Sequence, residues 1–397
     1  MTQPSFLRWR EIPGNVWVLG FVSLLMDISS EMIHALLPLY LVAVYGASAL
    51  AVGVIEGVAE ATAQIVKIFS GALSDRLGNR KWLAAAGYGL AAVTKPIFPL
   101  APSIGWLVAA RFIDRFGKGI RGAPRDALIA DSVPANLHGA SFGLRQSLDT
   151  IGAFLGPIIA IALMMLTADN FTVVFWIAAI PAFLSAALII LAVREPARTT
   201  GMVRSPLSPA QIGRLSKAFW VVVLLASAFT LARFSEAFLL LRAQSVGMSL
   251  ALVPIMLVVM NVVYALCAWP AGALSDRIGR YGILATGFAL LIAADLVLAM
   301  AGTAATVALG AALWGLHMGL TQGILASLVA DTAPEDLRGT AFGLFNLITG
   351  LATLAASVIA GVLWDVAGPA TTFFTGAIFT VLALCVVPVA YRMIAPP

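Results

Sequence analysis

Three ionisable side chains share one face of the first apolar segment of this 397-residue chain. Asp27, Glu31 and His34 lie within about 60° of one another on a helix that turns about 100° per residue. Two carboxylates one turn apart can share or hand on a proton, and imidazole titrates near neutral pH. With Met26 and Met32 beside them, the three groups could instead bind a divalent cation. A structural interpretation is also open, in which Asp27 meets a lipid headgroup and His34 hydrogen-bonds a neighbouring helix.

The second and fifth segments also carry charges at helical spacing. One narrow face of the second segment carries Glu56, Glu60 and Lys67. Lys67 is expected to be a counter-charge. The two acids are expected either to form a structural ion pair with it or to act in a proton relay. Arg145 and Asp149 are four residues apart and predict an internal ion pair.

The fourth segment carries a stripe of charges that no lipid-facing surface would have. The stripe lies within an arc of about 120° and consists of Arg111, Asp114, Arg115, Lys118, Arg121 and Arg125. We expect it to face water, a cavity or the carboxylates of neighbouring segments. Arg121, Arg125 and Asp126 are expected to mark the cytoplasmic end of the segment and to help fix topology. The same cations could also hold an anionic ligand.

The elements that position these groups must be membrane helices. Hydrophobic residues make up 61% of the chain and charged residues only 11%, and the apolar residues come in long runs. The net charge of +5 is scattered over segment ends, which argues against a nucleic-acid partner. Cys267 and Cys385 both lie in apolar segments, so neither a disulfide nor a thiolate metal site is expected. The first apolar run has no cleavage site and predicts a retained helix.

Twelve apolar segments are separated by charged or Gly/Pro-rich connections. They span about 15–45, 48–73, 82–101, 104–130, 139–166, 171–193, 218–244, 250–273, 281–301, 304–330, 339–365 and 371–392. Lys and Arg concentrate in the connections after even-numbered segments and at both termini, which predicts a multi-pass protein of the cytoplasmic membrane with both termini in the cytoplasm. The basic, Pro-containing stretch 194–217 predicts a cytoplasmic linker between bundles at 1–193 and 218–397.

Two motifs occur once in each half of the chain. The segment Gly71-Ala-Leu-Ser-Asp75-Arg-Leu-Gly78 recurs as Gly272-Ala-Leu-Ser-Asp276-Arg-Ile-Gly279, 201 residues later. The stretches 131–144 and 331–344 match at an offset of 200 residues. Two signatures at nearly the same offset indicate two related halves of six spans each, arranged around a central path.

In these motifs the chain resembles the major facilitator superfamily over essentially its whole length. The loop signature is carried by Gly71, Asp75, Arg76, Gly78 and Arg80, and by its counterparts Gly272, Asp276, Arg277 and Gly279. Arg111 with Gly117 and Gly119 resembles the family's helix-four signature. Gly152, Gly156 and Pro157 resemble a helix-five signature of exporters and antiporters, although Ala160 and Ile161 stand where that signature has paired glycines.

This resemblance implies an all-α integral membrane protein with twelve transmembrane helices in two pseudo-symmetric six-helix bundles. It also implies that helices one and four line a central cavity, so that Arg111 and Arg115 face the acids of the first helix. The Asp75 carboxylate is expected to act as a gate latch that accepts from free N–H groups at the start of a neighbouring helix, with Gly78 permitting the turn. The alternative is that these loop charges only fix topology.

The leading functional hypothesis is proton-coupled secondary transport by alternating access, with export of a small molecule. No nucleotide-binding loop and no His-Glu-x-x-His motif occurs, so we expect neither an ATP-driven pump nor an enzyme, and no cofactor. The expected partners are a small-molecule or ion substrate, protons and the lipid bilayer, and the chain is expected to be a monomer. The proton-coupling candidates are Asp27, Glu31, His34, Glu56 and Glu60. The substrate-cavity candidates are Arg111, Asp114, Arg115, Lys118, Arg145 and Asp149 in the first half, and Arg233, Glu236, Asn261, Tyr264, His317 and Gln322 in the second.

Three other functions stay open at this point. One is export of a divalent metal through Asp27, Glu31 and His34. Another is transport of an organic anion held by the cations of the fourth segment. The third is a transport-dead membrane sensor.

Overall fold

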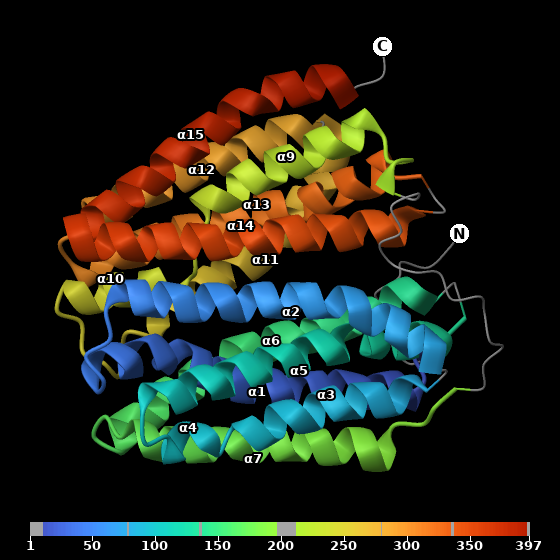
Figure 1. Cartoon of the computed structure of the whole chain (residues 1–397), viewed down its shortest axis with the longest axis horizontal. Coiled ribbons are helices and arrows are strands. Elements are labelled where there is room, and N and C mark those ends of the chain that lie inside the picture. Colours follow the sequence, from blue (N-terminus) through green and yellow to red (C-terminus); the bar gives the residue numbers. More distant parts are fainter. Residues whose placement is uncertain are drawn as a thin grey trace. The chain divides into compact units, whose positions relative to one another are not determined.

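The computed structural model describes residues 11–77, 79–134, 137–196, 212–278, 280–334 and 337–394, and these residues are almost entirely helical (Figure 1). The first seven helices are α1 (Gly14–Ala43), α2 (Ala49–Leu77), α3 (Arg80–Thr94), α4 (Ile97–Leu100), α5 (Ile104–Asp131), α6 (His138–Leu166) and α7 (Phe171–Ala192). The others are α9 (Lys217–Ala232), α10 (Ala237–Ser245), α11 (Ile255–Ile278), α12 (Arg280–Ala299), α13 (Ala304–Thr332), α14 (Arg338–Ala367) and α15 (Pro369–Ile394).

These helices correspond to the twelve expected spans. Among the described residues, ten candidate spans are long and apolar enough to cross a membrane, with α3 and α4 counted as one span and α9 and α10 as another. The other two expected spans are α5, which carries the charged stripe, and α11, whose apolar part is the shorter piece Ile255–Ala268. Most bounds agree with the sequence to within a few residues, but α11 begins and ends about five residues later than expected.

The chain forms two compact units. The first contains residues 1–37 and 62–205, and the second contains residues 38–61 and 206–397. The segment 38–61, which holds the end of α1 and the start of α2, therefore groups with the second unit. Most of the expected linker, residues 197–211, lies outside the described residues.

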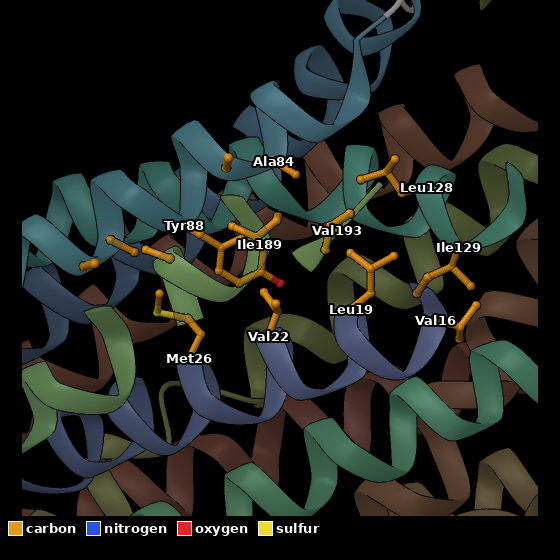
Figure 2. Packing of buried hydrophobic residues seen from close by; sticks show 14 of the residues in the cluster. Val16, Leu19, Val22, Met26, Ala84, Tyr88, Leu128, Ile129, Ile189 and Val193 are labelled. Carbon is orange, nitrogen blue, oxygen red and sulfur yellow. The ribbon is translucent and has the colours of Figure 1, made fainter. Parts of the chain in front are cut away.

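In the first unit one face of α1 forms the centre of the apolar core. Val16, Leu19, Val22 and Met26 recur at helical spacing and point toward α3, α5 and α7, where Tyr88 lies in the same cluster (Figure 2). Asp27 and Glu31 lie on a neighbouring face of α1, which packs on α6. The core thus fixes the rotation of α1 and presents its acids to α6.

In the second unit the start of α2 packs tightly on α14. The carboxylate of Asp365 accepts hydrogen bonds from the backbone N–H groups of Ala49 and Leu50, both at 2.9 Å, and so caps the first turn of α2. Gly53 and Gly361 permit the close approach, because a Cβ added at Gly53 would clash with the Ser357 carbonyl oxygen and one added at Gly361 would lie 2.5 Å from the Cα of Leu50.

Candidate functional site

The acids of α1 lie directly against the glycines of α6. Asp27 and Glu31 are both half-buried. A Cβ added at Gly152 would lie 2.9 Å from the Cβ of Asp27, and one added at Gly156 would lie 2.6 Å from the Cβ of Glu31. These two glycines, one turn apart, therefore let the backbone of α6 approach the carboxylates closely. Two glycines of the exporter-like motif and two of the proton-coupling candidates, Asp27 and Glu31, therefore meet at one contact.

His34 lies one turn further along α1 and is paired with the charged stripe of α5. Its Nδ1 is 2.8 Å from a terminal nitrogen of the Arg111 guanidinium, and both side chains are buried. Because guanidinium can only donate, Nδ1 of His34 is the acceptor.

The pairing of His34 with Arg111 bears on the divalent-cation alternative from the sequence. Within the described part of the chain, no three His, Cys, Asp or Glu side chains are placed to hold a metal ion together. The divalent-cation site of Asp27, Glu31 and His34 stays a prediction, and in this structure Nδ1 of His34 is occupied by the Arg111 guanidinium.

The buried carboxylate of Asp114, on α5, lies beside two cations, Lys95 and Arg115. Asp114 accepts from Lys95 Nζ at 2.9 Å and lies 3.8 Å from Nε of Arg115, and Lys95 also donates to Ser30 Oγ at 3.2 Å. All three charged side chains are no more than 3% exposed. Lys95 was not among the candidates from the sequence, although a lysine before Pro96 inside an apolar run was a usable signal.

A second ionic network joins α5 to α6. Arg145 is 3.1 Å from Asp149, which confirms the pair expected from their spacing, and it is also 3.3 Å from Asp126. Arg125 lies 3.0 Å from Asp126 and 3.9 Å from Asp149, and it donates to Ser23 Oγ on α1 at 3.0 Å. The network therefore alternates two guanidinium groups with two carboxylates.

This network and its neighbours supply the charges around Asp27. The groups that interact electrostatically with Asp27 are Asp149, Arg121, Lys118 and Arg125. The resemblance implied that Arg111 and Arg115 face the acids of α1. The α5 cations that interact with Asp27 are Lys118, Arg121 and Arg125, which lie on later turns of the helix.

Arg121 and Arg125 are more than topology markers. Arg121 is only 4% exposed and lies 5.0 Å above the ring of Tyr88, while Arg125 belongs to the network with Asp126. By contrast, Lys118 and Lys67 are exposed, and Lys67 lies beside Gly122 of α5 and interacts with Asp126. The second half of α5 is thus part of the internal ionic structure of the first unit.

The loop of the first motif copy, between α2 and α3, is held at its Arg80 end. The Arg80 guanidinium lies 2.6 Å from Asp131, and the backbone N–H groups of Arg80 and Lys81 donate to the carboxylate of Glu195 at 2.9 and 2.6 Å. Gly71 is a helical residue of α2 that faces Ala123 of α5. Gly78, Gly279 and the side chains of Asp75, Arg76, Asp276 and Arg277 lie outside what the structure describes.

In the second unit, three expected cavity residues come together. With its amide turned to satisfy its neighbours, Gln322 accepts from both terminal nitrogens of Arg233 at 2.9 and 3.2 Å. The hydroxyl of Tyr264 lies 3.3 Å from the other amide atom of Gln322. Arg233 ends α9 and Glu236 precedes α10, so this cluster sits beside a helix break. Asn261, one turn before Tyr264 on α11, is half-buried.

The remaining candidates lie apart from that cluster. His317 is fully buried beside Phe229 and Trp314, in the core and not at a polar wall. Glu56 is fully buried and Glu60 half-buried in the segment that groups with the second unit. The sequence reading also missed Asp295, a lone acid in the apolar run of α12, which is fully buried. Its position in the middle of an apolar segment was the available signal.

Comparisons with known proteins agree with this architecture. The family model described as Major Facilitator Superfamily matches residues 19–354 and 237–397. An MFS-type transporter of Methanocaldococcus jannaschii is 35% identical, with 94% of each chain covered. The quinolone resistance protein NorA of Staphylococcus aureus is 24% identical over 59% of this chain and 60% of its own. The nucleoside transporter NupG has the same fold, with a TM-score of 0.81 at 13% identity over 95% of this chain and 100% of its own.

Proposed function

Because the chain belongs to the major facilitator superfamily, a family of membrane transporters, we propose that it is a proton-coupled secondary transporter that exports a small molecule by alternating access. It works in the cytoplasmic membrane with both termini in the cytoplasm, as the distribution of Lys and Arg indicates. Its two functional halves are the bundles 1–193 and 218–397.

The observation that carries the proposal is the contact between α1 and α6. Asp27 and Glu31 are held against Gly152 and Gly156 with no intervening side chain. A carboxylate that gains or loses a proton changes its charge, its hydrogen bonding and its tolerance of an apolar neighbour. At this contact such a change acts directly on the backbone of α6 and therefore on how the two helices pack.

The ionic surroundings of Asp27 supply the coupling. Its charge is balanced by Arg121, Lys118 and Arg125, while Asp149 opposes it. A cationic or polar substrate that entered near this cluster would compete for the same carboxylate, so binding of substrate and binding of a proton would exclude each other. This exclusion is what an antiporter requires.

Two further observations favour export of a small organic molecule. The glycine-rich motif with Gly152, Gly156 and Pro157 resembles the signature of exporters, and the relative NorA bears the name of a quinolone resistance protein. In the second half, Arg233, Tyr264 and Gln322 offer a polar cluster beside a helix break, and we assign them to substrate recognition. The duplicated Asp75 and Asp276 loops serve as the gates.

Transport assays in proteoliposomes test the proposal. Asp27→Asn and Glu31→Gln keep the shape of each side chain but remove its titration, so accumulation driven by a pH gradient should be lost. Asp169→Asn is the matched control, because Asp169 is exposed at a turn with a positive φ of 61°, a conformation that asparagine also adopts. Full pH-driven transport by the Asp27 and Glu31 variants would show that the coupling groups lie elsewhere.

A further inference from the structure

Asp295, on α12 of the second unit, is a carboxylic acid in an apolar enclosure. Its side chain is completely buried, and neither carboxylate oxygen has a hydrogen-bond partner within the described part of the chain. The acid lies against Gly376 of α15, where an added Cβ would be 2.8 Å from Oδ2 of Asp295 and 3.1 Å from the Phe234 ring. Phe234 itself contacts the rings of Trp314 and Phe373, at 5.5 and 5.4 Å between centroids.

The neighbouring polar groups of α13 are also unsatisfied. Packing contacts bring Gly310 against Leu298 and Gly287 against Thr321, so α12 and α13 run antiparallel and Asp295 lies level with the turn that carries Trp314. His317 follows about one turn further. Within the described residues, the Trp314 Nε1 and both ring nitrogens of His317 have no hydrogen-bond partner.

The charged groups on the surrounding elements are held by other partners. Arg233, at the end of α9, is engaged by Gln322 and interacts with His317. Arg242 of α10 donates to the carbonyl oxygens of three residues at the end of α12, namely Leu298, Ala299 and Ala301, at 2.8, 3.2 and 2.6 Å. Glu236 lies at the helix break. The polar groups that α15 brings to this region are Thr372 and Thr380, and both hydroxyls donate to backbone carbonyls.

Such an enclosure is compatible with only one form of the acid. An ionised carboxylate with no hydrogen bond and no counter-charge is strongly disfavoured in an apolar interior, whereas a protonated one is tolerated. A proton also adds no volume beside Gly376 and Phe234, where the packing is already close. The ligand that suits this site is therefore a proton.

We propose that Asp295 is a second proton-binding site of this protein, in the second unit and separate from Asp27 and Glu31. Release of the proton requires a partner for the anion that forms, and the break between α9 and α10 controls access to one. Phe234 lies in that break, immediately after Arg233, and its ring lies beside the same glycine, Gly376, as the carboxylate. If Phe234 moves away, Arg233 or water can reach Asp295 and stabilise its charge.

The break is suited to such a movement. Arg233 has non-helical backbone angles, and the backbone N–H of Ser235 is bonded to the Ser357 hydroxyl on α14 at 3.2 Å in place of a helical carbonyl. One side-chain hydrogen bond is easier to exchange than a continuous helical ladder. Proton binding by Asp295 does not depend on the proposed function, but its use in transport rests on that function.

Infrared difference spectroscopy of the purified protein tests the site without any transport assay. Wild-type protein should show the C=O stretching band of a protonated aspartic acid at neutral pH, and Asp295→Asn should lose it. Labelling the chain with carboxyl-13C aspartate should shift the band, which assigns it to aspartate even if the variant folds poorly. Asp27→Asn and Asp365→Asn should keep it, because the band belongs to Asp295, and the Asp365 carboxylate already accepts two backbone N–H groups. A spectrum unchanged in Asp295→Asn, or a band that ignores the label, would overturn the proposal.

The role in transport is tested separately. Asp295→Asn should lose accumulation driven by a pH gradient while it keeps counterflow exchange of substrate. Unchanged pH-driven accumulation would remove Asp295 from coupling but would leave the infrared result intact. Failure of the Asp27 and Glu31 experiment would likewise leave the infrared band of Asp295 unaffected, so the two proposals fail independently.

Discussion

Gly156→Ala should disturb the contact between α1 and α6 more than any conservative change of the acids themselves. The new methyl carbon would lie 2.6 Å from the Cβ of Glu31, 3.0 Å from the carbonyl oxygen of Ile28 and 3.2 Å from the backbone nitrogen of Met32. Two of these three atoms belong to the backbone of α1, so a side-chain rotation cannot relieve the clash. The helices must move apart locally.

The size of the effect follows from two opposing contributions. Overpacking of a close interface costs about 1–3 kcal/mol. Replacing glycine by alanine inside a helix stabilises it by about 1 kcal/mol through helix propensity. We therefore expect a net loss of up to about 2 kcal/mol in the stability of the helix pair, together with a displacement of the Glu31 carboxylate.

Gly143→Ala is the matched control. Gly143 lies on the same helix, is exposed, and has no atom within 4 Å of an added Cβ, so it experiences the propensity gain without the clash. Thermal unfolding in detergent should show a lower midpoint for Gly156→Ala and an equal or higher one for Gly143→Ala. Transport driven by a pH gradient should fall in the first variant only. If the two variants behave alike in both assays, the close contact with Glu31 is unimportant and the reasoning is refuted.

Three other variants test separate parts of the structure. Asp114→Asn leaves the buried Lys95 without its carboxylate partner. The thermal midpoint should fall by an amount that corresponds to about 3–5 kcal/mol. A second substitution in the same protein, Lys95→Met, should recover part of this loss. Asp365→Ala removes the cap of α2 and should cost about 0.5–2 kcal/mol in thermal unfolding, and no change would show that water replaces the cap. Gly376→Ala places a methyl group 2.8 Å from Asp295 and should shift the carboxylic-acid infrared band, and an unshifted band would contradict the described packing.

The sequence was sufficient for the helices but not for their partners. Apolar length and charged connections located the twelve spans, because these properties belong to each segment by itself. The same holds for the face shared by Asp27 and Glu31 and for the pair Arg145 and Asp149, which depend only on helical periodicity.

Contacts between helices depend on rotation and register, which hydropathy leaves undetermined. The resemblance implied that Arg111 faces the acids of α1, but only the structure shows that its guanidinium lies beside His34 of that helix. Lys95 and Asp295 were missed for a related reason, since a single charge in an apolar run carries no periodic signal. Only the structure shows that Lys95 is neutralised by Asp114, whereas neither carboxylate oxygen of Asp295 has a hydrogen-bond partner within the described residues.

Arg242 joins the short helix α10 of the second unit to the end of α12. Its three hydrogen bonds to the carbonyl oxygens of residues 298, 299 and 301 fasten α10 to the end of α12, whereas only the four-residue break joins α10 to α9. The short helix α10 and the end of α12 must therefore move as one rigid piece, with the break as the hinge. Asp295 is less than one turn from the point of attachment, so a rotation at the hinge is transmitted to the acid through hydrogen bonds, without the need for a large rearrangement of α12.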